Sequence, residues 1–118
     1  MFDLARSGLT AELRTQVAAG VPANLTNAGG DTLLILAAYH RHPATVAALL
    51  ELGSDPGRVN DRGQTALAAA VFRQSAEMVR MLLDAGADPD GGEPSAARTA
   101  EFFHLPEMTE LLAGHRAG

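Results

Sequence analysis

The feature that most constrains the fold of this chain of 118 residues is an internal repeat. The segment 30–56 reads GDTLLILAAYHRHPATVAALLELGSDP, and with a shift of 33 it aligns without a gap on the segment 63–89, which reads GQTALAAAVFRQSAEMVRMLLDAGADP. The matching landmarks include Gly30 and Gly63, Thr32 and Thr65, Ala37 and Ala70, Val46 and Val79, Leu49 and Leu82, and Gly53 and Gly86. Such a period predicts stacked units, because one unit alone cannot bury its apolar face.

The repeat continues toward both ends of the chain in shortened form. After the same shift toward the N-terminus, Gly20 falls on Gly53, so the start of the chain is expected to form a repeat that lacks its beginning. In the other direction Ser95 falls on Thr65 with a step of 30, because the connecting segment has lost three residues. We therefore expect one domain made of an N-terminal cap (1–27), two repeats (28–60 and 61–90) and a shortened C-terminal cap (91–118).

Each unit carries the signals of two short antiparallel helices. Thr32 and Thr65 are expected to cap a first helix, since a threonine hydroxyl can bind the free N–H groups at a helix start. Pro43 is placed at the first turn of the second helix, where a missing N–H does no harm. Gly53 is expected to end that helix, because glycine readily takes the left-handed conformation. Ala37 and Ala38 predict close contact between adjacent units.

The pattern G-x-T-x-L-x-x-A, followed by V-x-x-L-L-x-x-G-[AS]-D, resembles the ankyrin repeat, whose length is about 33 residues. The resemblance covers nearly the whole chain and extends to small stand-alone bacterial ankyrin repeat proteins. It departs from the family's T-P-L-H at positions 32–35 (TLLI) and 65–68 (TALA). The resemblance implies an all-α solenoid of helix-turn-helix units with extended turns between repeats.

Composition and charge exclude several classes of partner. The chain carries 14 acidic residues against nine arginines and a formal net charge of −5, so a basic footprint for nucleic acid or anionic lipid is missing. A neutral or basic protein surface is the more natural partner. The N-terminal sequence has no basic segment followed by a long apolar stretch, so we expect a cytoplasmic protein.

Residue types that often carry chemistry have structural explanations at their positions. Without cysteine, the chain has no disulfide or thiolate chemistry. Ser75 and Ser95 fit helix caps better than nucleophiles, and the glycine pairs lack the Lys-Ser/Thr of a phosphate-binding loop. We expect no metal site, since turn and surface positions explain the histidines, which are His40, His42, His104 and His115. We also expect no cofactor and no catalytic residue.

The resemblance also implies where a partner would bind. In the ankyrin family the contact surface is the concave groove formed by the turn tips and the inner helices. Carried onto this chain, those positions give the candidate partner-binding residues Arg6, Asp31, Tyr39, His40, Asp61, Arg62, Gln64, Phe72, Arg73, Phe102 and Phe103.

Three of the five aromatic residues occupy one repeat position, Tyr39, Phe72 and Phe102, each seven residues after a predicted cap. Seven residues are close to two helical turns, so these rings should line the groove together with turn residues. They either pack against one another as groove wall or anchor a partner, and both can hold in part. We hypothesise that an apolar or basic segment lies along them, in a field set by the acids Asp31, Asp61, Glu93 and Glu101.

The sequence therefore predicts a non-catalytic protein–protein interaction module that is monomeric and has an unidentified protein partner. Two alternatives stay open. One is a self-associating protein in which the first unit exposes Phe2 and Leu4 to a second copy. The other is an enzyme with an unrecognised site.

Overall fold

The structure is a computed structural model that describes the backbone of residues 1–117 and the side chains of residues 1–114. The His115 side chain, one of the predicted surface histidines, lies outside the described residues. The described part of the chain is all-α and forms these helices: α1 (Phe2–Ser7), α2 (Thr10–Ala18), α3 (Leu33–Tyr39), α4 (Pro43–Glu51), α5 (Ala66–Phe72), α6 (Ala76–Asp84), α7 (Ala96–Phe102) and α8 (Pro106–Ala117). The predicted fold class is confirmed.

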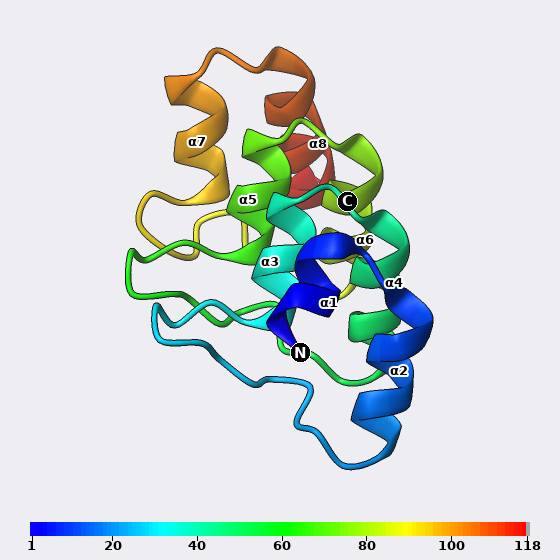
Figure 1. The fold of residues 1–118 in the computed structure, drawn as a ribbon. Helices are drawn as coiled ribbons and strands as arrows, with labels where there is room; N and C mark the ends of the chain where they lie inside the picture. Colours follow the sequence, from blue (N-terminus) through cyan, green and yellow to red (C-terminus); the bar gives the residue numbers. More distant parts are fainter. Residues whose placement is uncertain (118) are drawn as a thin grey trace.

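The helices form two layers that run along the long axis of a 40 × 26 × 20 Å molecule. In the inner layer α1, α3, α5 and α7 lie side by side in chain order, and α2, α4, α6 and α8 do the same in the outer layer (Figure 1). Long connecting segments after the outer helices project to one side of the inner layer (Figure 1). Each helix pair therefore packs mainly on the pair before it and the pair after it.

Hydroxyl caps begin four of the helices. The side chains of Thr32, Thr65, Ser75 and Ser95 each accept a hydrogen bond from the backbone N–H three residues later, at 3.0, 3.1, 3.3 and 3.1 Å. Thr32, Thr65 and Ser95 cap the inner helices α3, α5 and α7. The predicted caps are confirmed, and so is the shorter step to the last of them.

A left-handed residue ends each inner helix before the turn into its outer partner. These residues are Gly8 (φ 69°), Arg41 (φ 58°), Gln74 (φ 57°) and His104 (φ 52°), and they occupy one repeat position. Only the first is a glycine, so the other three carry side chains in a conformation that glycine accepts at lower cost. The repeat thus fixes the backbone path even where the residue type changes.

The core lies between the layers and along the inner stack. All six residues from Leu33 to Ala38 are buried, as are all six from Ala66 to Val71. Leu49 and Leu82 of the outer layer are completely buried. The many alanines allow neighbouring inner helices to approach closely, which explains a core with few aromatic residues.

Residues at the start of the chain take part in this core. Phe2 and Leu4 are partly buried and pack against it, so only part of each side chain is exposed for the self-association alternative. His42 donates a hydrogen bond from Nε2 to the Arg6 carbonyl oxygen at 2.7 Å. This bond crosses from the second helix pair to the first, so His42 joins two units in addition to occupying a turn.

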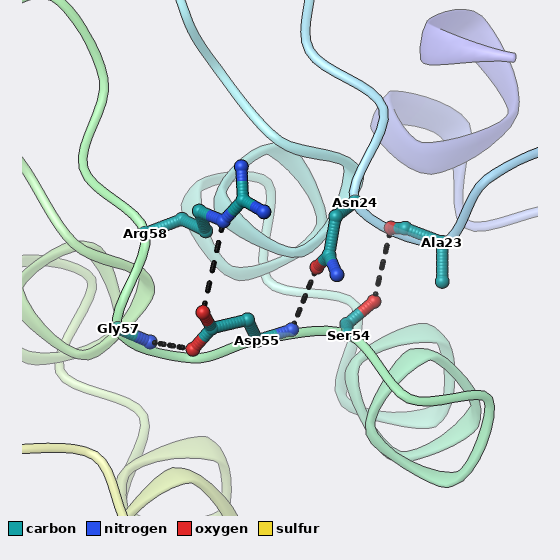
Figure 2. Close-up of polar contacts among 6 residues, drawn as sticks. All are labelled: Ala23, Asn24, Ser54, Asp55, Gly57 and Arg58. Atoms are coloured by element: carbon teal, nitrogen blue, oxygen red, sulfur yellow. Dashed lines mark hydrogen bonds and ion pairs between the residues drawn. The ribbon is translucent and has the colours of Figure 1, made fainter.

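Successive connecting segments are joined by hydrogen bonds. Ser54 Oγ donates to the Ala23 carbonyl at 3.2 Å, and the backbone N–H of Asp55 donates to Asn24 Oδ1 at 2.7 Å (Figure 2). The Asp55 carboxylate accepts a bond from the Gly57 N–H at 2.8 Å, which fixes its own turn (Figure 2). These bonds join the segment that follows α4 to the segment that follows α2.

Candidate functional site

A groove with a volume of about 790 Å³ runs across the inner helices α3, α5 and α7. Its floor consists of nearly buried residues at two repeat positions of these helices, Ile35 and Leu36, Ala68 and Ala69, and Thr99. The floor residues of α5 are alanines, so the middle of the floor carries little side-chain volume. The floor is therefore apolar where α3 and α5 form it, and α7 adds the polar Thr99.

The groove has two walls of different character. The turn tips form one wall, with Asp31, Arg62, Gln64, Glu93 and Pro94. The C-terminal ends of the inner helices form the other, with Arg6, Tyr39, His40, Phe72, Phe102 and Phe103. The sequence prediction that the aromatic rings share a groove with the turn residues is confirmed.

The aromatic rings of the second wall form a continuous ladder. Tyr39 and Phe72 are stacked with an interplanar angle of 7° and a centroid distance of 6.3 Å. Phe72 meets Phe103 edge to face at 5.3 Å, and Phe103 meets Phe102 in the same way at 4.9 Å. Tyr39, Phe72, Phe103 and Phe102 remain 45, 41, 48 and 77% exposed. Packing against neighbours and exposure to solvent therefore coexist in these rings.

The ring that continues the ladder from Phe72 is Phe103, whereas the repeat register selects Phe102. Consecutive residues of a helix point about 100° apart, so Phe102 and Phe103 cannot both face the same neighbour. Phe102 is the last residue of α7 and is the most exposed of the four rings. It lines the groove as well and adds exposed aromatic surface beside Phe103.

Nine of the eleven candidate residues line the groove, and Asp61 and Arg73 do not. Asp61 lies in a turn tip, and its own backbone N–H donates to the Gly29 carbonyl oxygen at 3.0 Å. The Arg73 guanidinium lies over the Tyr39 ring, 5.8 Å from its centroid, and so adds a charge beside the ladder. Whether any of the eleven binds a partner stays a prediction.

The floor residues were not among the predicted site residues. Ile35, Ala68 and Arg98 occupy one repeat position, and Leu36, Ala69 and Thr99 occupy the next. The repeat register that located the aromatic rings would also have located these positions. Their most informative member is Arg98, because an arginine replaces the apolar residue of the two preceding helices.

The turn-tip wall is held by amide side chains. Asn60, only 4% exposed, accepts bonds at Oδ1 from the N–H groups of Arg62 and Gln64, both at 2.9 Å. Its Nδ2 donates to Asp31 Oδ1 at 2.8 Å, which links two successive turns. Asn27 occupies the equivalent position of the preceding turn and donates to Asp31 Oδ2 at 3.4 Å. Both oxygens of Asp31 therefore already accept hydrogen bonds within the protein.

The charged lining of the groove contains three arginines, Arg6, Arg62 and Arg98, against two carboxylates, Asp31 and Glu93. Arg6 pairs with Asp3, which lies outside the groove, at 2.9 Å. Within the described residues, Arg62 and Arg98 form no ion pair. Of the four acids that were expected to set the field, Asp61 and Glu101 lie outside the lining. The lining therefore carries both signs of charge, and whether the acids set the field for a partner stays a prediction.

His40 stands at the end of the ladder, with its ring edge-on to Tyr39 at 5.3 Å. Partial burial lowers its pKa, and the positive charges of His42, Arg6 and Arg73 lower it further. The neutral imidazole is therefore favoured in the folded protein more than in a free histidine. Within the described residues, no three histidine or carboxylate side chains converge as metal ligands, and no helix is long and apolar enough to cross a membrane.

Comparison with known proteins places the chain in a family. A family model described as ankyrin repeats, in three copies, matches residues 2–91. A Pseudomonas aeruginosa protein that carries the name of an ankyrin repeat protein is 50% identical over 46 residues. That alignment covers 39% of this chain and 27% of the relative, so the chain matches only about a quarter of the relative's length.

Proposed function

Because the chain belongs to the ankyrin repeat family, whose members are generally protein–protein interaction modules, we propose that it binds a partner protein in the groove across α3, α5 and α7. The partner would lie on the apolar floor, between the turn tips and the aromatic ladder. We propose a binding role without catalysis, carried by a monomer.

The observation that carries this proposal is the aromatic ladder. Tyr39, Phe72 and Phe103 touch one another and yet remain 45, 41 and 48% exposed. Rings held by neighbours lose little further freedom on binding, so burying them against a partner costs little ordering entropy. Exposed aromatic residues in a concave site are typical hot spots of protein interfaces.

The matching experiment truncates Phe72, the central ring. A partner is captured from a lysate of the source organism and then purified. The partner's free energy of binding to Phe72→Ala should be less favourable than to the wild type by about 2 kcal/mol or more, as expected for a hot spot. That loss corresponds to about a 30-fold rise in Kd measured by calorimetry.

Val59→Ala is the matched control, since Val59 is also exposed (49%) but lies outside the groove lining. It should leave Kd within about twofold, which is under about 0.5 kcal/mol. Equal affinities for the wild type and Phe72→Ala would contradict the groove as the binding surface. Light scattering on the free protein tests the monomer, and a concentration-dependent dimer would favour self-association instead.

A further inference from the structure

We propose, on the basis of the function proposed above, that the groove takes an extended peptide segment that combines apolar side chains with carboxylates. The apolar side chains would lie on the floor and against the ladder, and the carboxylates would pair with guanidinium groups of the groove. The occupant is thus a segment of a partner protein that is acidic around its apolar anchors.

Arg98 is the first reason. It lines the groove at the repeat position that Ile35 and Ala68 fill in the preceding helices, so it brings a positive charge to a position that is apolar on α3 and α5. Its backbone N–H is used by the Ser95 cap at 3.1 Å, whereas its guanidinium forms no ion pair with any described residue. Arg98 is exposed, so a carboxylate of a ligand can reach its guanidinium and accept two parallel hydrogen bonds from it.

The second reason is the balance of free charges along the two walls. On the turn-tip wall Arg62 has no ion-pair partner among the described residues, while the Asp31 carboxylate accepts hydrogen bonds from the neutral amides of Asn60 and Asn27 and keeps its charge. Beside the ladder, Arg73 adds a further positive charge over the Tyr39 ring. Asp31 and Glu93 are the carboxylates of the lining. Arg62 and Arg98 are therefore the guanidinium groups of the lining that no described carboxylate pairs with, and they remain available to a ligand.

Short-range charges decide this preference, even though the whole molecule carries a net charge of −5. At physiological salt, charges more than about 8 to 10 Å apart are largely screened, so the groove lining outweighs the acids on distant faces. The net charge lowers the rate at which an acidic segment arrives, whereas the local arginines strengthen the bound state. The acidic segment proposed here differs in charge from the apolar or basic segment that the sequence suggested.

The experiment begins with a library of random dodecapeptides displayed on phage and selected on the immobilised full chain. Enriched sequences should carry net negative charge together with at least two large apolar residues. The best peptide is then synthesised with a fluorophore, and its Kd is measured by anisotropy at several salt concentrations. Binding should weaken as salt rises, since it depends on charge pairs near the surface.

Arg98→Gln tests the charge and Arg80→Gln is its matched control, because Arg80 is an exposed arginine of α6 outside this groove. We expect Arg98→Gln to raise Kd at least tenfold and Arg80→Gln to change it less than twofold. Thermal melts of both variants verify that the fold is retained. Enrichment of basic or neutral peptides, no enrichment at all, or an unchanged Kd for Arg98→Gln overturns the proposal.

A Phe72→Ala variant distinguishes this proposal from the proposed function. If the selected peptides lose affinity for Phe72→Ala but are basic or neutral, the groove binds peptides and only the charge preference is overturned. If acidic peptides bind Phe72→Ala as tightly as the wild type, they dock elsewhere and both proposals fail. If the chain binds only a second copy of itself, the acidic segment is overturned as occupant.

Discussion

Gly63→Ala tests whether successive turn tips pack against each other backbone to backbone. Gly63 has φ +78°, and a Cβ built there would lie 2.6 Å from the carbonyl oxygen of Glu93. The same contact includes a hydrogen bond from the Glu93 N–H to the Gly63 carbonyl at 2.8 Å. Since the obstacle is backbone, no side-chain rotation can relieve the clash.

The expected cost has two parts. A left-handed conformation costs an L-residue roughly 1 to 2 kcal/mol, and overpacking against a fixed neighbour costs about 1 to 3 kcal/mol more. Gly63→Ala should therefore lower the free energy of unfolding by about 2 to 5 kcal/mol, a large share of the roughly 5 to 15 kcal/mol typical of a domain. Urea denaturation followed by circular dichroism measures the change.

Gly53→Ala is the matched control for the conformational part alone. Gly53 also has a positive φ, +95°, but nothing lies within 4 Å of a Cβ built there. Its cost should be only the roughly 1 to 2 kcal/mol of the left-handed conformation. If Gly63→Ala loses no more stability than Gly53→Ala, the turn tips do not pack as described, and the wall of the groove has no rigid support.

Further predictions concern the core, the absence of ligands and one titration. Leu82→Ala, at a completely buried site, should lower the free energy of unfolding by about 2 to 5 kcal/mol. Arg62→Ala, at a turn tip, should change it by no more than roughly 0.5 kcal/mol. Equal losses of stability in urea melts would mean that the repeat register is wrong. Chelator, zinc and ATP should leave Tm unchanged, and a shift of several degrees with any of them would revive the enzyme alternative. The NMR titration midpoint of His40 should lie below 6.5, because burial and nearby positive charges lower its pKa. Since the fold favours neutral His40, its contribution to stability is fully present above pH 6.5 and declines as pH falls below it; a midpoint above 6.5 would contradict this.

The sequence predicted the parts of the fold that depend on local, repeated signals. The caps at Thr32, Thr65 and Ser95 and the burial of Leu49 and Leu82 follow from residue type and spacing alone. The same repeat register predicted that the aromatic rings lie in one groove, because residues at equivalent positions of stacked helices face the same way. The division into units at 1–27, 28–60, 61–90 and 91–118 stays a prediction.

Features that depend on contacts between units were missed. Asn60 is an ordinary turn residue in sequence, and only the structure shows that its buried amide joins two turns. The ladder passes through Phe103 because ring contacts depend on side-chain direction, which repeat spacing does not specify. The net charge of the chain does not describe a local surface, so it could not indicate that Arg62 and Arg98 line the groove beside Asp31 and Glu93.

The measurement that tests the central claim most directly is site-specific photo-crosslinking to the purified partner. A benzophenone amino acid replaces Phe102, the most exposed ring of the groove, in one variant and Val59, which lies outside it, in another. The account predicts a crosslinked partner from position 102 and none from position 59 at equal saturation. Crosslinking from position 59 alone would place the partner on another face and contradict the groove as the binding site.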